Sequence, residues 1–109
     1  MTDLASRSCS PQQGPALTAD RAKKLLEQLS GWTMSPDAKE IRRTFKFQSY
    51  YATIAFVNAV AWIAHREDHH PDMTVGYNTA TVAFSTHSVG GLSENDFISA
   101  AKIDALGTL

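Results

Sequence analysis

The spacing of apolar residues changes along the chain from a helical period to a strand period and back. Between Thr18 and Gly31, alanine and leucine recur every three or four residues, which predicts a helix over 19–29. Thr18 is a favourable N-cap, and glycine is typical just beyond a helix end. Residues 1–17 are rich in serine, glutamine, glycine and proline without a period. This predicts a disordered tail ahead of a folded domain that spans 18–109.

Four later segments alternate apolar with polar residues, the period of a strand with one buried face. They lie at 32–34, 40–47, 73–78 and 79–87. Turn-forming residues separate the first two segments, and the last two follow each other directly, so both pairs are expected to form hairpins. Arg43 interrupts the apolar side of the second segment. Consecutive hairpins favour an antiparallel sheet.

The strongest helical pattern covers 49–68, where Ser49 can act as the N-cap and the apolar arc is wide enough to favour self-association. Pro71 disfavours helical backbone at His70, so this helix should end at or before that residue. A third helix over 93–106 closes the chain. The order α-β-β-α-β-β-α predicts an α+β fold in two layers, a four-stranded antiparallel sheet with helices packed on one face.

Composition excludes several classes of function. The chain has 109 residues, of which 43% are hydrophobic and 19% charged, as in a single globular domain. A net charge of −1 supplies no basic field, so no direct binding of nucleic acid is expected. No apolar run approaches the ~20 residues of a membrane helix, and no signal-peptide pattern is visible. With a single cysteine, Cys9, these features favour a cytoplasmic protein without a membrane partner.

All four histidines lie between His65 and His87, three of them in the stretch HREDHHPD. His65 and His69 are four residues apart, which would place two metal ligands on one helix face. However, the chain lacks an HExxH motif, and adjacent residues such as His69 and His70 do not normally converge on one ion from a helix. A zinc site is therefore disfavoured.

Two other interpretations of the histidines stay open from the residues alone. A polar helix end complements the helix dipole, and it accounts for His65. It does not account for His69 and His70 at the helix break, nor for His87 at a strand end. If the hairpin over 73–87 folds back, these three imidazoles approach one another. They would then form a general acid–base site without a nucleophile.

Further motifs are shared with a known family. DHHPD at 68–72 precedes a short hairpin containing YN, which is followed by STH at 85–87 and GLSENDF at 91–97. Upstream lie GW and a strand that ends in FKF. In this order and spacing, the motifs resemble pterin-4α-carbinolamine dehydratase over about residues 18–106.

The resemblance implies a four-stranded antiparallel sheet with helices on one face, and assembly into homodimers or homotetramers. It implies a lyase that eliminates water from 4a-hydroxytetrahydropterin to give quinonoid dihydropterin, in tetrahydrobiopterin recycling for the aromatic amino acid hydroxylases. The pterin is then the substrate, and neither a metal nor a bound cofactor is expected. Some relatives are instead non-catalytic partners in the dimerisation or assembly of other proteins. The intact set of three histidines favours the enzyme.

Carried over by residue, the resemblance makes His69, His70 and His87 the catalytic imidazoles. His69 and His87 are the expected acid–base pair, and His70 is expected to orient the substrate. The expected substrate-binding residues are Asp68, Pro71, Ser85, Thr86, Ser88, Asp96 and Trp32.

Several of these positions have a structural alternative or depart from the family. Asp96 fits a capping box with Ser93, which is the favoured interpretation, and Trp32 fits a buried position in the core. His65 stands where the family often has glutamate, and Met73 where it often has a bulky aromatic residue. These two differences bear on the pH optimum and on substrate affinity rather than on the class of reaction.

Overall fold

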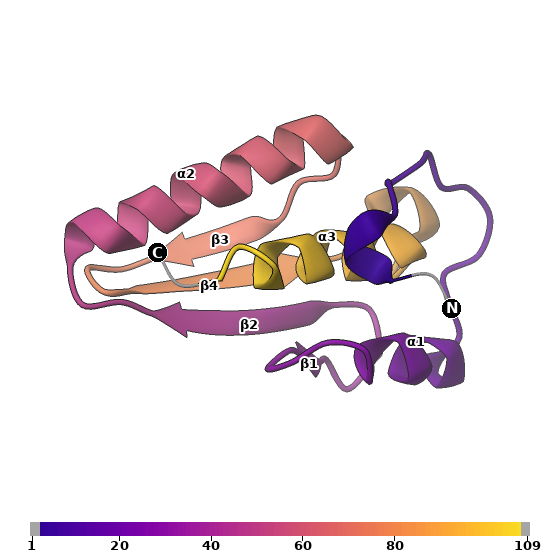
Figure 1. Ribbon diagram of the computed structural model, residues 1–109. Coiled ribbons are helices and arrows are strands. Elements are labelled where there is room, and N and C mark those ends of the chain that lie inside the picture. The colour runs from indigo at the N-terminus through magenta and orange to yellow at the C-terminus, as the bar shows by residue number, and fades with distance from the viewer. Residues whose placement is uncertain (1–2, 108–109) are drawn as a thin grey trace.

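The computed structural model describes residues 3–107 as a sheet with α-helices packed against it (Figure 1). The helices are the 3-10 helix η1 (Leu4–Ser6), α1 (Ala19–Leu26), α2 (Tyr50–Glu67), the 3-10 helix η2 (His87–Val89) and α3 (Glu94–Asp104). The strands are β1 (Thr33–Met34), β2 (Ile41–Lys46), β3 (Asp72–Val75) and β4 (Thr79–Phe84). The predicted α+β class and the order of its α-helices and strands are confirmed.

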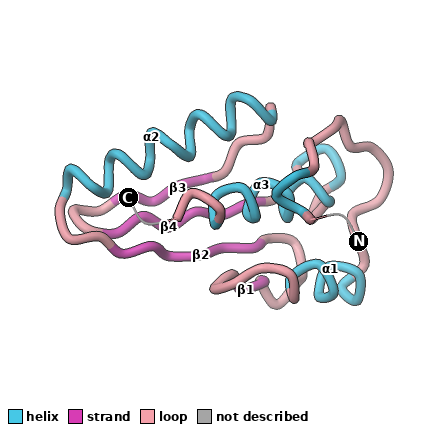
Figure 2. The backbone as a smooth tube through the Cα atoms, viewed as in Figure 1, coloured by secondary structure: helices cyan, strands magenta, loops and turns pink. Residues whose placement is uncertain are grey.

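The four strands form one antiparallel sheet in the order β1-β2-β4-β3 (Figure 2). In the central pair, Ile41 of β2 lies opposite Phe84 of β4. On the other side of β4, Asp72 of β3 lies opposite Ala83. The hairpin therefore returns the end of β4 to the start of β3, as expected. This brings the two histidine-bearing segments to the same end of the sheet.

The core lies between the inner face of the sheet and the helices α2 and α3. Phe56 and Val60 from α2 meet Val82 and Phe84 from β4 and Phe97 from α3, and each of these side chains is at most 3% exposed. Burying one such side chain contributes roughly 1.5–3 kcal/mol. The inward-facing apolar residues of β4 therefore pack against the apolar stripe of α2, and this contact holds the helix on the sheet.

Arg43, which interrupts the apolar side of β2, is neutralised by a carboxylate from α3. Its Nη1 lies 2.8 Å from Asp104 Oδ1 and donates to the carbonyl oxygen of Ser30 at 2.7 Å. The indole Nε1 of Trp32 donates to the same carboxylate at 2.9 Å. A cation on an apolar face is tolerated here because both its charge and its N–H groups have partners.

Several element boundaries differ from the sequence prediction, and β3, expected over 73–78, is Asp72–Val75. The helix expected over 19–29 ends as α1 at Leu26, because Leu29 N bonds to the carbonyl of Leu26 in a tighter turn. The strand expected to reach residue 87 ends at Phe84, where its partner strand also begins, at Ile41. Beyond that point neither β2 nor β3 pairs with the chain, Thr86 forms only an isolated bridge with Gly91, and His87 opens η2 instead of ending a strand.

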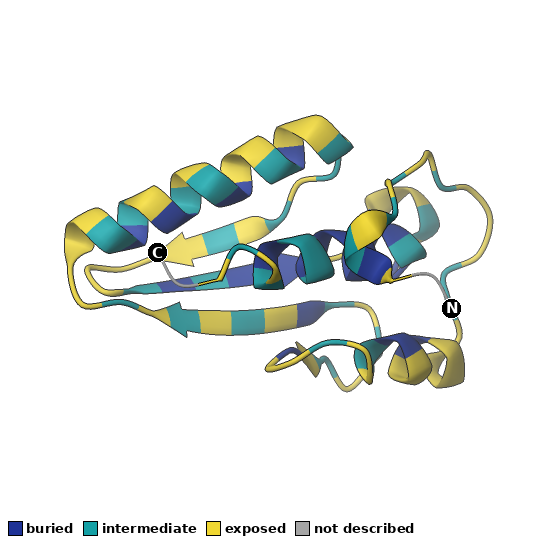
Figure 3. Cartoon of the chain, in the orientation of Figure 1, coloured by how far each residue is buried: buried dark blue, intermediate teal, exposed yellow. Residues whose placement is uncertain are grey.

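The described part of the segment expected to be a disordered tail, residues 3–17, packs against the domain (Figure 3). Leu4 in η1 is 2% exposed and belongs to the core. Leu17 N donates to the carbonyl of Leu92 at 2.9 Å. Local composition gave no sign of this order because the contacts reach residues as far as 97 positions along the chain.

Candidate active site

His69 lies where the chain leaves α2. Asp68 caps the helix in the left-handed conformation, with φ at 51°, and the backbone N of His69 donates to the carbonyl of Ala64 at 3.2 Å. The His69 ring then stacks on Phe84 at the end of β4, with 5.8 Å between ring centroids and 8° between planes. The side chain is 10% exposed. The helix cap and the sheet thus fix this imidazole in one orientation.

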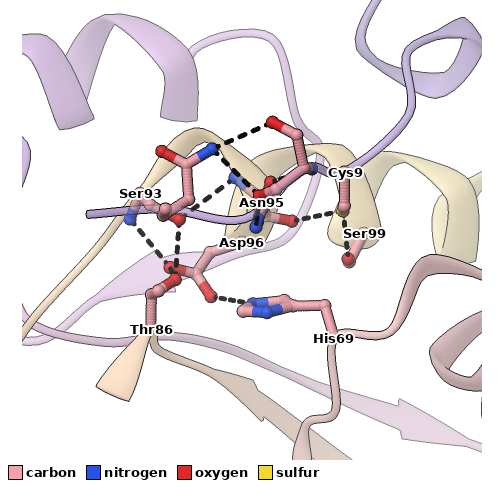
Figure 4. Close-up of polar contacts among 9 residues, drawn as sticks. Cys9, His69, Thr86, Ser93, Asn95, Asp96 and Ser99 are labelled. Atoms are coloured by element: carbon pink, nitrogen blue, oxygen red, sulfur yellow. Dashed lines mark hydrogen bonds and ion pairs between the residues drawn. The ribbon is translucent and has the colours of Figure 1, made fainter. Parts of the chain in front are cut away.

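The His69 ring is bound by a carboxylate that has no contact with solvent. Asp96 is 0% exposed, and its Oδ1 lies 2.6 Å from His69 Nε2 (Figure 4). Its Oδ2 accepts hydrogen bonds from Ser93 N at 2.9 Å and from Thr86 Oγ1 at 2.7 Å. The bond to Ser93 completes the predicted capping box of α3. The same carboxylate is therefore both a helix cap and the partner of His69.

A chain of hydroxyl groups supports Asp96. Thr86 Oγ1 and Ser93 Oγ lie 2.7 Å apart, and Ser93 Oγ accepts from the backbone N of Asn95 at 3.2 Å. An ionised carboxylate only accepts, so Thr86 donates its proton to Asp96, and Ser93 donates to Thr86. Within residues 3–107, no buried side-chain N or O atom lacks a partner. The network is complete, which makes it rigid.

This arrangement decides which nitrogen of His69 is free for chemistry. Because the ionised Asp96 accepts from Nε2, that nitrogen carries a proton in both the neutral and the cationic ring. Nδ1 is then the nitrogen that gains and loses a proton. A buried carboxylate behind an imidazole also holds the ring in one tautomer and one orientation.

A cavity of about 370 Å³ opens beside this pair. Its lining includes four of the predicted site residues, namely Asp68, His69, Thr86 and Ser88. It also includes Asn95, Arg66, Glu67 and the segment from Cys9 to Gln12. The volume is at the lower end of the roughly 300–1,000 Å³ that is usual for small-molecule sites. It suits one compact ligand with several polar groups.

The other predicted residues of the two histidine segments lie on the surface around this end of the sheet. His70 and His87 are exposed, and each directly follows a residue of the cavity lining, His69 and Thr86 respectively. Ser85 is also exposed. Pro71, which precedes β3, is partly buried. The segments 68–71 and 85–88 thus meet, but only His69 among the histidines is enclosed, and the roles of the other two stay predictions.

Trp32 lies in the core and not in the lining of the cavity. It is 6% exposed, and its ring packs between Phe45 and Phe84, with centroid separations of 6.2 and 6.0 Å. Its nitrogen is satisfied by Asp104. The placement agrees with the buried-core alternative and not with a pocket wall, although Trp32 supports Phe84, on which His69 stacks.

The two departures from the family lie outside this cavity lining. His65 is exposed on α2, and its ring contacts Trp62 with 5.9 Å between centroids. Met73 lies on β3, partly buried against the core. Asp96 is therefore the anionic partner of His69 in this chain.

Sequence reasoning missed the residues that the N-terminal segment and α3 bring to the cavity. Cys9 N donates to Glu67 Oε1 at 2.8 Å, and the Cys9 thiol lies near Ser99 Oγ at 3.4 Å. Burial, with a further contribution from the charge of Glu67, raises the pKa of the Cys9 thiol to about 11. The thiol is therefore protonated at neutral pH and is no nucleophile. Only the long-range fold brings these groups to the site.

Within residues 3–107, no three histidine, cysteine or acidic side chains converge in a way that could hold a metal ion. Nε2 of His69 is already bound to Asp96. The same part of the chain contains no helix with both the length and the apolar character that a membrane span requires.

Comparison with known proteins identifies the family of this chain. The family model for pterin 4 alpha carbinolamine dehydratase matches residues 15–106. The chain belongs to the pterin-4-alpha-carbinolamine dehydratase family. A relative from Nitrosospira multiformis, named "Putative pterin-4-alpha-carbinolamine dehydratase", is 58% identical over 95% of this chain and 92% of its own. One of the same name from Stenotrophomonas maltophilia is 58% identical over 94% and 90%.

Solved structures of the pterin dehydratase family share the fold. A Brucella melitensis protein described as a transcriptional coactivator/pterin dehydratase has a TM-score of 0.79 and 33% identity, covering 84% of this chain and 97% of its own. A pterin dehydratase-like protein described as a RuBisCO assembly factor in the alpha-carboxysome has a TM-score of 0.62 and 25% identity, covering 72% and 93%. Relatives with this fold thus carry descriptions of both enzymes and assembly factors.

Proposed function

We propose that this chain is a 4a-hydroxytetrahydrobiopterin dehydratase, a carbon–oxygen lyase that removes water from 4a-hydroxytetrahydropterin to give quinonoid dihydropterin. The observation that carries the proposal is the enclosed pair of His69 and Asp96 beside a cavity of about 370 Å³. Family membership supports the same reaction class. The client pathway is then the recycling of tetrahydrobiopterin used by aromatic amino acid hydroxylases.

The reaction needs one acid and one base, and imidazoles supply both. The bond between C4a and the hydroxyl oxygen breaks as an imidazolium protonates that oxygen, so that water leaves. The lone pair of the neighbouring ring nitrogen N5 forms the new C=N bond, and a neutral imidazole takes the proton from N5. Both protein groups exchange one proton, so no oxidant or reductant is consumed. Positioned acid–base groups of this kind typically contribute a factor of 10²–10⁴ in rate.

His69 is the most strongly fixed participant in this scheme. Asp96 holds it through Nε2, which leaves Nδ1 for proton transfer, and Phe84 fixes the ring plane. We propose His87 as its acid–base partner and His70 as an orienting group, because each adjoins a residue of the cavity lining. Both side chains are exposed in the structure, and we expect a pterin bound in the cavity to contact and cover them.

The decisive experiment is a direct assay of the decay of 4a-hydroxytetrahydropterin by the purified wild-type protein, with and without a chelator. We expect turnover well above the spontaneous rate and insensitive to the chelator, since imidazoles perform both proton transfers. His69→Ala and His87→Ala should each lose about a hundredfold or more in kcat. Unchanged turnover in both variants would refute the acid–base pair, and a wild-type rate equal to the spontaneous rate would refute the enzyme.

A second function, as a protein partner, is favoured by one feature of α2. Tyr50, Tyr51 and Trp62 are 60%, 85% and 60% exposed, an unusual run of large apolar side chains along one helix. We propose that this outer face of α2 mediates homodimer or homotetramer formation. Because one structural relative is described as an assembly factor, the alternative is that a different protein binds this face of α2.

A further inference from the structure

Four consecutive residues of the N-terminal segment, Cys9–Gln12, line the same cavity as His69 and Thr86. We call these four residues the N-terminal strap. We propose that the strap is a wall of the pterin site and that Asn95 is the positioning residue that holds it there. This inference rests on the proposed function, because it names a further part of that site.

The strap is tied to the elements around the cavity at three successive points. Cys9 N donates to Glu67 Oε1 at the end of α2, at 2.8 Å. Asn95 at the start of α3 binds both backbone groups of Ser10: its Oδ1 accepts from Ser10 N at 3.1 Å and its Nδ2 donates to the carbonyl of Ser10 at 2.7 Å. Ser88 Oγ in η2 donates to the carbonyl of Gln12 at 2.9 Å.

Beyond Cys9, which packs against the core, these ties do not serve to bury apolar surface. Ser10 and Pro11 are exposed, whereas the apolar anchors of the N-terminal segment, Leu4 and Leu17, lie on either side of the strap. Ordering a backbone segment costs conformational entropy, which polar contacts in water only partly offset. A segment held in this way, by partners that themselves line the cavity, is suited to shape the cavity.

Asn95 connects the strap to the proton-transfer pair. It is 7% exposed, its backbone N donates to Ser93 Oγ at 3.2 Å, and it immediately precedes Asp96. The side chain of Asn95 therefore holds the strap, while its backbone belongs to the network that fixes Asp96. One turn of α3 orders both the wall of the cavity and the partner of His69.

The strap contributes to binding rather than to proton transfer. Its only titratable side chain is Cys9, whose thiol stays protonated because its pKa is about 11. What the strap offers is neutral and polar: the hydroxyl of Ser10 and the carboxamide of Gln12, which donates to the carbonyl of Ser10 at 3.1 Å. Loosening the strap should weaken the hold on a polar heterocycle without changing the chemical step.

The test compares Asn95→Ala with wild type in three measurements: turnover kinetics, equilibrium binding of biopterin by fluorescence titration, and hydrogen exchange of the backbone amides of Cys9 and Ser10, which both donate hydrogen bonds. We expect Asn95→Ala to raise KM and the Kd for biopterin roughly three- to tenfold, with kcat within about twofold. The strap amides should exchange faster. Gln12→Ala should raise KM in the same direction, whereas Gln13→Ala, an exposed neighbour outside the cavity lining, should not.

Each other outcome decides against the inference. Faster exchange with unchanged KM and Kd would make the strap a structural cover only, and unchanged exchange would mean that Asn95 does not hold it. If Asn95→Ala fails to fold, Ser88→Ala removes only the hydroxyl that binds Gln12, and the same criteria apply to it. If the wild type binds biopterin without turnover, the proposed function is refuted. The Kd of Asn95→Ala for biopterin, compared with that of wild type, then still decides whether the strap is a wall of the site. A wild type that does not bind biopterin refutes both.

Discussion

At the scale of residues, the site depends on a carboxylate with two duties. Asp96 stabilises the first turn of α3 through Ser93 and orients His69 through its other oxygen. A solvent-exposed carboxylate at this position would only cap the helix. Burial makes the second possible, because a buried charge must be fully paired, and here its partners are an imidazole, a hydroxyl and a backbone amide.

Asp96→Asn tests the orienting role. The amide cannot accept from both Thr86 and His69 as the carboxylate does, so the preferred tautomer of His69 is lost. We expect kcat to fall about a hundredfold. The proton of the neutral His69 ring should no longer be fixed on Nε2, which the 15N chemical shifts of the ring would show.

The matched control is Asp20→Asn, an exposed carboxylate in the first turn of α1, which should keep both kcat and the tautomer of His69. A purely structural Asp96 would give a different result. In that case thermal stability would drop, while the kcat of the folded fraction and the tautomer of His69 stayed unchanged.

The Cys9 thiol gives a residue-scale prediction about pH and stability. Burial raises its pKa in the folded protein from 9.0 to about 11. A folded-state pKa above the unfolded value means that the stabilisation is fully present below pH 9 and is lost as the pH rises toward 11. In urea unfolding, the free energy of unfolding of wild type should fall more steeply between these two values than that of Cys9→Ser. Equal slopes would contradict the burial of the thiol.

At the scale of elements, the end of α2 decides where His69 lies. Asp68 is the C-cap in the left-handed region, which costs an ordinary L-residue roughly 1–2 kcal/mol but suits glycine and is tolerated by aspartate. This one backbone conformation turns the chain from the helix toward β3 and sets the imidazole against Phe84.

Two substitutions separate the backbone role of Asp68 from its predicted contact with the pterin. Asp68→Ala should lower the free energy of unfolding by about 1 kcal/mol, because alanine is strained at positive φ. Asp68→Gly should not lower it by the same mechanism. If the carboxylate also binds substrate, both variants raise KM, and a normal KM in the stable Asp68→Gly protein would limit Asp68 to the cap. Urea unfolding and steady-state kinetics on the same samples give both answers.

At the scale of the whole molecule, α2 has one face in the core and another that carries exposed aromatic residues. Its inner face buries Phe56 and Val60, while Tyr51 and Trp62 lie outside. A lone helix of a stable monomer would more often be polar there. The wide apolar arc in the sequence therefore corresponds to two surfaces, and the sheet covers only one of them.

Trp62→Glu tests the proposed self-association. A charge in the middle of a buried interface is costly, so the variant should sediment as a smaller species than wild type at the same concentration. Gln28→Glu, which adds a charge on the exposed side of α1, should leave the sedimentation unchanged. A wild type that sediments as a monomer would contradict self-association and favour a heterologous partner for this face.

Much of the fold could be predicted from local sequence patterns, because a helix cap or an apolar period reflects the geometry of a single helix or strand. Ser49 caps α2 and Ser93 caps α3, and the apolar alternation of β4 faces the core. The candidate site followed only in part. The motifs pointed to His69, Thr86 and Asp96, but motifs do not distinguish an enclosed histidine from an exposed one.

The sequence by itself determined the α+β class, the hairpins and the meeting of the two histidine segments, since periodicity and turn residues act over a few positions. Only the tertiary structure decided that Asp96 binds His69, that Trp32 belongs to the core, and that the N-terminal segment lines the cavity. These depend on contacts between residues such as Ser10 and Asn95, which are 85 positions apart. Composition describes what a segment can bury on its own, and the strap is ordered by partners from the far end of the chain.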